Sequence, residues 1–126
     1  MDSKVNSANN TVTRKALMVD EDKDRYRRKE RNDMLKQAGF KVYPVLRMQD
    51  VSARCKPGAF DLIVVNGTIN PEAAAQISEQ IKANDPKQRI LLVSKQNHDR
   101  DYVVSDWAEL NRRLSSQNLP NDLVAA

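Results

Sequence analysis

The chain has 126 residues, of which 40% are hydrophobic, a size that suits one domain with a modest core. The 21 Lys and Arg residues outnumber the 17 Asp and Glu residues, and the net charge of +4 permits contact with nucleic acid or acidic proteins without requiring it. The chain has a single cysteine, Cys55, which excludes an internal disulfide. With only one histidine in addition, it has too few ligands for a structural zinc site. No apolar run approaches the roughly 20 residues of a membrane span, and residues 1–4 lack the apolar segment of a signal peptide. We therefore expect a reducing, bacterial-type cytoplasmic setting.

The domain is expected to cover residues 14–116. Residues 1–13 are rich in Ser, Asn and Thr and predict a flexible N-terminal arm, while residues 117–126 are polar and predict a trailing C-terminal tail. The apolar run at 16–19 predicts a strand buried on both faces, ending at the acidic triplet 20–22.

A helix is predicted over residues 25–38, which contain no Gly or Pro, with Asp22 or Asp24 as its cap and Gly39 as its stop. Its apolar stripe is thin, and its basic residues are interpreted as a solvated face. These residues are Arg25, Arg27, Arg28, Lys29 and Arg31.

Strands and helices alternate in the next part of the chain. Residues 40–46 predict an edge strand, because Pro44 cannot donate to a neighbour, and a short helix is expected at 49–55. Residues 61–65 and 90–93 predict two further buried strands. A helix between them starts near Pro71 and turns Ala74, Ile77 and Ile81 inward. This alternation predicts an α/β fold with a doubly wound parallel sheet.

The last third permits two interpretations. In the first interpretation, residues 102–104 form a fifth strand. Only residues 95–101 then connect it to the fourth strand, and this connection is too short for an ordinary crossover helix. In the other, a single helix runs from near Asp99 to Ser116. The polar pair Asp106 and Glu109 resembles a capping box, and we prefer the strand for that reason.

Polar residues follow the predicted strands, at the edge where parallel sheets bind ligands. Two carboxylates beside an amide provide hard oxygen ligands of the kind that Mg²⁺ accepts, and the alternative is that the acidic residues only cap the next helix. The residues are Asp20 and Glu21 after the first strand, Asn66, Gly67 and Thr68 after the third, and Ser94 and Lys95 after the fourth.

Four segments resemble, in order and spacing, the receiver domain of two-component response regulators. They are residues 15–22 (KALMVDED), 34–42 (MLKQAGFKV), 60–65 (FDLIVV) and 90–94 (ILLVS). The resemblance implies a flavodoxin-like fold of five strands and a Mg²⁺ site at an acidic pair. It also implies phosphorylation of an aspartate after the third strand, with a Ser or Thr and a Lys reading the phosphate.

Matched residue by residue, the resemblance gives Asp20 and Glu21 as the acidic pocket, with Thr68 beside it, and Ser94 as the switch residue. The phosphoacceptor position holds Asn66, and an amide cannot act as the nucleophile that forms an aspartyl phosphate. The position of the lysine holds Ser105, and only the neighbouring Lys95 offers an anion contact. The resemblance therefore implies a degenerate pseudo-receiver without catalytic activity.

A missing or shortened fourth helix is also expected, as in some pseudo-receivers. The apolar side of the fourth strand would then be partly uncovered, which predicts a partner, a homodimer or a swapped helix.

We therefore expect a module that acts in signal transduction by phosphorylation-independent docking to a protein, which is a signalling kinase, an output domain or a second copy. No cofactor is required in this interpretation. One alternative is a switch that responds to weakly bound Mg²⁺ or a small ligand at Asp20 and Glu21. Another is nucleic-acid binding by the basic helix, which its acidic residues and lack of aromatic partners argue against.

Overall fold

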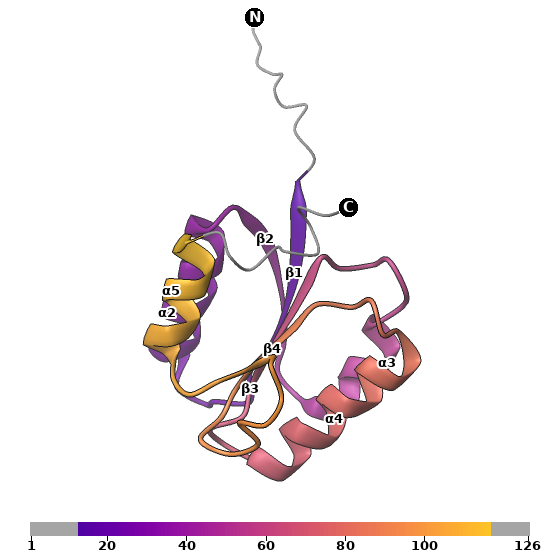
Figure 1. The fold of residues 1–126 in the computed structure, drawn as a ribbon. Coiled ribbons are helices and arrows are strands. Elements are labelled where there is room, and N and C mark those ends of the chain that lie inside the picture. Colours follow the sequence, from indigo (N-terminus) through magenta and orange to yellow (C-terminus); the bar gives the residue numbers. More distant parts are fainter. Residues whose placement is uncertain (1–12, 117–126) are drawn as a thin grey trace, which may run out of the picture.

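A computed structural model describes residues 13–116, which form a central β-sheet with helices on both sides (Figure 1). All strand pairs are parallel, and the order in the five-stranded sheet is β2-β1-β3-β4-β5. The strands are β1 (Arg14–Val19), β2 (Phe40–Val45), β3 (Leu62–Asn66), β4 (Ile90–Val93) and β5 (Val103–Val104). The helices are α2 (Arg25–Gln37), the 3₁₀ turn η1 (Met48–Asp50), α3 (Val51–Arg54), α4 (Pro71–Asn84) and α5 (Trp107–Ser116).

This strand order confirms the expected doubly wound, flavodoxin-like sheet. The expected arm over 1–13 and tail over 117–126 lie outside the described residues, apart from Thr13. Within residues 13–116, no helix is long and apolar enough to span a bilayer.

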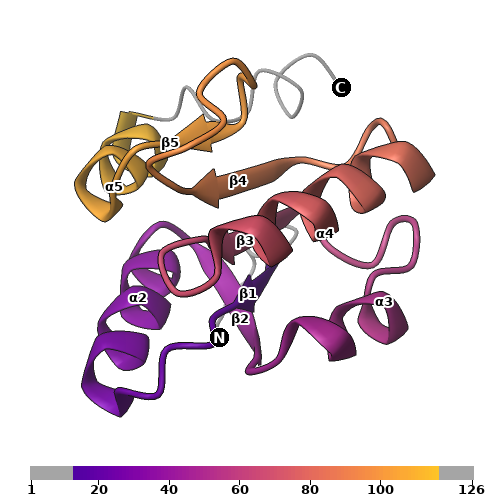
Figure 2. The same ribbon diagram turned by 90° about the horizontal axis from the view of Figure 1, so that it is seen from below.

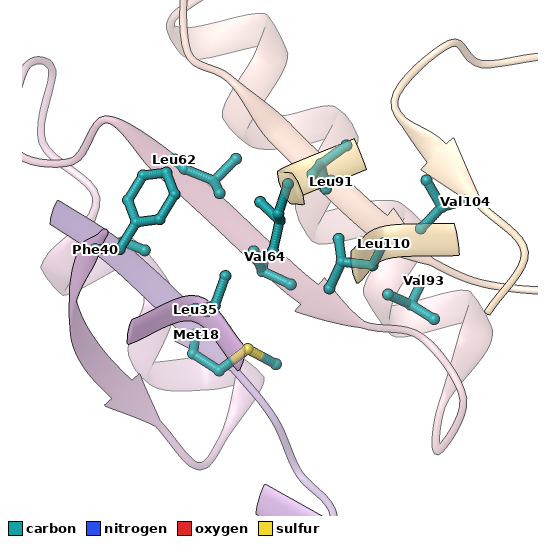
Figure 3. Packing of buried hydrophobic residues seen from close by; sticks show 11 residues of the cluster. Met18, Leu35, Phe40, Leu62, Val64, Leu91, Val93, Val104 and Leu110 are labelled. Atoms are coloured by element: carbon teal, nitrogen blue, oxygen red, sulfur yellow. The ribbon is translucent and has the colours of Figure 1, made fainter. Parts of the chain in front are cut away.

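Each face of the sheet carries its own apolar cluster, as the alternation of side chains along a strand requires. Helices α2 and α5 lie together on one side, and α3 and α4 on the other (Figures 1 and 2). Figure 3 shows the first cluster, in which Leu35 of α2 and Leu110 of α5 pack against Met18 and Val64 of the central strands. On the opposite face, Ala74 and Ile81 of α4 pack with buried strand residues, which include Leu17, Val19, Ile63, Val65 and Leu92.

The helix ends follow the residues that the sequence provides for them. Asp24 caps α2 by accepting from the backbone N–H groups of Tyr26 and Arg27, and Gly39 ends the turn after it with a positive φ of 101°. Asn70 caps α4, where Pro71 opens the first turn. The helix predicted at 49–55 is divided between η1 and α3.

Strand β2 is an edge strand, as the proline within it predicts. It pairs only with β1 within the described sheet, with Pro44 opposite Met18. An edge position tolerates a residue that has no N–H to donate on its solvent side.

The last third follows the preferred interpretation: β5 is a strand, and α5 begins at Trp107. Residues 94–102, all described, connect β4 to β5 without a helix, so the fourth helix is missing as expected. The capping interaction is also present in part. Asp106 Oδ1 accepts from the Glu109 backbone N–H at 2.8 Å, while the Glu109 carboxylate accepts from the N–H and hydroxyl of Ser105.

The expectation of a partly uncovered fourth strand is wrong. Ile90, the most exposed residue of β4, is only 3% exposed. Helix α4 covers this face, and Tyr102 and Val103 pack into the same cluster. The connecting loop is also tied to α4, because Arg100 forms an ion pair with Glu79 at 2.7 Å.

Candidate functional site

The candidate site lies where the strand order reverses, at the carboxyl ends of β1 and β3. Chain connections from these two neighbouring strands leave in opposite directions, which opens a crevice between the loops. Asp20 follows β1 directly, and Asn66 is the last residue of β3. Their exposed fractions are 2% and 0%, so both polar side chains are buried and need partners.

Both ends of the Asn66 amide are engaged. Its Nδ2 donates to Asp20 Oδ1 at 2.8 Å, and its Oδ1 accepts from the Thr68 backbone N–H at 2.9 Å and from the Thr68 hydroxyl at 2.6 Å. Thr68 therefore lies in the site as expected. The amide forms a bridge between the loops after β1 and β3, and a carboxylate at this position would lack the donor.

The structure brings only one member of the predicted acidic pair, Asp20, into contact with Asn66. Glu21 contacts a different segment: its Oε2 accepts from the backbone N–H of Met48 at 2.8 Å, beyond the end of β2. Asp22 is the second carboxylate of the site instead. The extended backbone continues past β1, since the Asp20 N–H bonds to Val45 O, and alternate side chains of extended chain point to the same side.

Arg31 joins the two carboxylates. Its Nη1 lies 3.0 Å from Asp20 Oδ2 and 3.1 Å from Asp22 Oδ2, and the residue is 9% exposed. Arg27 adds a second guanidinium, with Nε 2.7 Å from Asp22 Oδ2. The interpretation of this basic helix as a solvated face is therefore wrong for Arg31. Helical spacing of four residues from Arg27 brings both side chains to the same end of the sheet.

These contacts change the titration of Asp22. The hydrogen bonds from Arg27, together with the backbone N–H of Asp24 and the guanidinium of Arg31, hold the pKa of the Asp22 carboxyl well below its usual range. Arg28 adds a bond from Nη1 to the backbone oxygen of Asp22 at 2.6 Å. Asp22 is thus a fixed anion surrounded by arginines.

On its other side, the Arg31 guanidinium lies over the indole of Trp107. The Cζ atom is 4.5 Å from the ring centroid, a cation–π distance. Trp107 is the first residue of α5, so Arg31 connects the site to that helix. The indole Nε1 is buried and has no hydrogen-bond partner within residues 13–116.

The site in this form does not fit Mg²⁺. A magnesium ion needs oxygen ligands free to face it, and it usually binds one or two carboxylates with water. Here Arg31 contacts oxygens of both Asp20 and Asp22, and Asn66 Nδ2 takes a further bond to Asp20. The described residues also contain no cluster of three His, Cys, Asp or Glu side chains suited to a metal.

The remaining predicted residues are divided between the site and the surface. Ser94 is 1% exposed beside Gly67, and its hydroxyl accepts from the Gln96 N–H at 3.0 Å. Lys95 is exposed. Ser105 occupies the position at which the resemblance implies a lysine. Its backbone N–H and its hydroxyl donate to Glu109 in the first turn of α5.

Sequence reasoning did not identify Asp22, Arg31 and Trp107 as site residues. Asp22 could have been predicted from Asp20, because residues i and i+2 of an extended chain have side chains on the same side. Nothing in the sequence distinguished Arg31 from the other basic residues of the same helix. Its contact with Trp107 joins residues that are 76 positions apart in the chain (107 − 31).

Comparisons of sequence alone find no relative: no protein-family model matches the chain, and no curated protein matches it. Comparison of structure does find similar proteins. A CheY-like response regulator receiver domain protein from Methanospirillum hungatei matches with a TM-score of 0.70 and 12% identity over 91% of this chain and 100% of the other.

Response regulator protein TrrA from Thermotoga maritima, in complex with Mg²⁺ and BeF, matches with a TM-score of 0.65 and 16% identity over 84% of this chain and 98% of TrrA. A complex of histidine kinase ThkA with TrrA also matches, with a TM-score of 0.63 and 15% identity over 83% of this chain and 98% of the other. Identities this low carry the fold alone. The chain therefore has the fold of response regulator receiver domains.

Proposed function

We propose that this chain is a pseudo-receiver: a receiver-fold module that acts in cytoplasmic signal transduction by docking to a protein partner, without phosphorylation and without catalytic turnover. The observation that carries the proposal is the Asn66 amide at the end of β3, bonded to both Asp20 and Thr68. An amide has no anionic oxygen to attack phosphorus, so an acyl phosphate cannot form on it.

The surroundings of Asn66 support the same proposal. The carboxylates nearby are neutralised by Arg31 and Arg27, so the site has little remaining charge with which to attract a metal–phosphate complex. No lysine is available at the position of Ser105, whose hydroxyl and N–H are given to Glu109. A switch driven by phosphate would need both free carboxylates to bind the metal and a lysine to contact the phosphate.

A protein partner is supported by the exposed side chains around the site. Among the described residues, the large hydrophobic side chains that are at least half exposed are Tyr26, Leu46 and Ile69. They follow β1, β2 and β3 respectively, and the carboxyl ends of parallel strands share one edge of the sheet. Of the matching structures, the complex with ThkA contains a histidine kinase bound to a receiver-fold protein. For this chain we propose a signalling kinase, an output domain or a second copy as the partner.

The two alternatives are less well supported. A Mg²⁺-responsive switch needs free oxygens on Asp20 and Glu21, but Arg31 holds the first and the Met48 N–H holds the second. A nucleic-acid interface needs free cations on α2. Lys29 is instead paired with Asp33 at 2.7 Å, and Arg27 with Asp22.

The test is incubation with acetyl phosphate and Mg²⁺ followed by intact-mass measurement. We expect no phosphoryl adduct on the wild-type chain. A stable adduct that maps to the peptide containing Asn66, or to a carboxylate beside it, would contradict the proposal.

A further inference from the structure

The buried charges of the site come from two segments of the same chain. Asp20 and Asp22 follow β1, and Arg31 comes from the second turn of α2. One nitrogen of Arg31, Nη1, is within 3.2 Å of Asp20 Oδ1, 3.0 Å of Asp20 Oδ2 and 3.1 Å of Asp22 Oδ2. A single cationic nitrogen thus occupies the point where the two carboxylates converge.

A guanidinium suits this position better than other cations of the chain. It is planar and always charged, so Nη1 can bond the carboxylates while Cζ lies over the Trp107 indole, 4.5 Å from the ring centroid. The indole is apolar and covers the side of the cation that does not meet the carboxylates. Burial at 9% exposure strengthens the attraction between the charges relative to that at the surface.

We propose that Arg31 is the resident cation of this site, a tethered ligand that takes the place of a divalent metal and closes the pocket to Mg²⁺. The guanidinium belongs to the same chain as the carboxylates. Unlike a free metal ion, it therefore loses no translational freedom on binding, and its effective concentration at the site is high. A metal ion would have to break the three Nη1 contacts and compete with Asn66 Nδ2 for Asp20.

This inference deepens the proposed function by naming what holds the site in one state, and it predicts a latent metal site. Without the guanidinium, the Asp20 and Asp22 carboxylates remain where their oxygens converge, while the Asn66 amide oxygen stays bonded to Thr68. Mg²⁺ usually binds one or two carboxylates and keeps several water ligands, so these two carboxylates suffice for a weak site. Among the described residues, Arg31 is the one side chain that contacts both carboxylates, while of the two Arg27 bonds only Asp22 and Asn66 only Asp20.

The experiment compares wild type with Arg31→Met, which keeps an unbranched side chain out to the position of Nε and removes the guanidinium with its charge. Thermal unfolding is followed with and without millimolar Mg²⁺, and the fluorescence of Trp107, the single tryptophan, is titrated with Mg²⁺. We expect no saturable response in wild type. In Arg31→Met we expect the melting temperature to rise by about 4–8 °C at a Mg²⁺ concentration of about ten times its Kd.

Two control variants make the result specific. Arg25→Met removes an exposed arginine from the first turn of the same helix and should behave as wild type. Arg31→Met combined with Asp20→Asn should lose the Mg²⁺ response, because one of the two carboxylates is gone. A response that survives in this double variant would overturn the assignment of the metal site to Asp20.

A measurement on the wild type keeps the proposal falsifiable if Arg31→Met does not fold. Stoichiometric Mn²⁺ should leave the amide NMR signals of Asp22 and Gly67 unbroadened in the wild type. Broadening of both signals, a saturable Mg²⁺ response of the wild type, or a folded Arg31→Met that ignores Mg²⁺ would each overturn the proposal. A phosphoryl adduct on a metal-free wild type would contradict the proposed function and leave the role of Arg31 standing.

Discussion

The Asn66 amide and the Asp20 carboxylate are joined by a hydrogen bond of 2.8 Å from Nδ2 to Oδ1, with both residues buried. This bond links the ends of β1 and β3, and it requires a donor on residue 66. The amide that we propose to stand at the phosphoacceptor position therefore also supplies a structural contact.

Asn66→Asp should destabilise the protein at neutral pH. The substitution removes the donor and places a second carboxyl against Asp20, and we expect the free energy of unfolding to fall by about 1–3 kcal/mol. The loss should shrink at lower pH, because like charges raise the pKa of one member of such a pair. Urea unfolding at several pH values measures the effect. Asn70→Asp, at the exposed cap of α4, is the matched control and should be nearly neutral, since Asp caps as well as Asn.

Asp22 should make the protein sensitive to acid. Its pKa in the folded state is lowered from the ordinary value of 3.8, mainly by the hydrogen bonds from Arg27. The ionised carboxyl therefore contributes stability that is fully present well above pH 3.8 and is lost progressively as the pH falls through and below that value.

Asp22→Asn removes that contribution. We expect the variant to be less stable than wild type by about 2 kcal/mol at pH 7 and the difference to narrow toward pH 3. Circular dichroism of urea unfolding across this range is the measurement. Asp33→Asn, which breaks the exposed pair with Lys29, should change the stability little at any pH. A constant difference between Asp22→Asn and wild type at all pH values would refute the role of the charge.

Arg31 and Trp107 should be energetically coupled. A double-mutant cycle with Arg31→Met and Trp107→Leu isolates their interaction, and we expect a coupling energy of about 1–2 kcal/mol for a cation–π contact that is largely out of water. The control cycle pairs Arg25→Met with Trp107→Leu and should give additive effects. Additivity in the first cycle would mean that α5 is not linked to the site.

Gly67 should not tolerate a side chain. A Cβ at this position would lie 2.6 Å from the backbone oxygen of Val93 and 3.0 Å from Leu92 Cδ1, so the β3–β4 contact would have to open. We expect Gly67→Ala to lower the free energy of unfolding by about 3 kcal/mol. Gly58→Ala, where a Cβ meets no atom within 4 Å but φ is +80°, should cost about 1 kcal/mol. Equal losses would argue against close packing at Gly67.

Much of the fold could be predicted from the sequence because its signals are local. The apolar run of β3, the Pro44 of an edge strand and the Asp106–Glu109 capping pattern each depend on neighbours in the chain, and all three appear in the structure. The cover over β4 could not be predicted in this way. It depends on Tyr102 packing and on the ion pair between Arg100 and Glu79, which joins distant segments.

The site was predicted in position and only partly in composition. Asp20, Asn66 and Thr68 meet as expected, because strand ends fix them. Glu21 was assigned to the pocket because it follows the first strand and because the resemblance matches it to the acidic pair, yet its carboxylate bonds the backbone N–H of Met48. Arg31 is buried through the orientation of α2 on the sheet, and orientation is a property of tertiary packing.

The central claim is that the site keeps one state whether or not metal and phosphoryl mimic are present. The direct measurement is the backbone amide NMR spectrum of the wild-type chain, with and without Mg²⁺ and beryllofluoride. We predict unchanged amide signals for Asp20, Asp22, Gly67 and Ser94, because Arg31 and Asn66 already satisfy the site. Saturable shifts of these signals would contradict the claim.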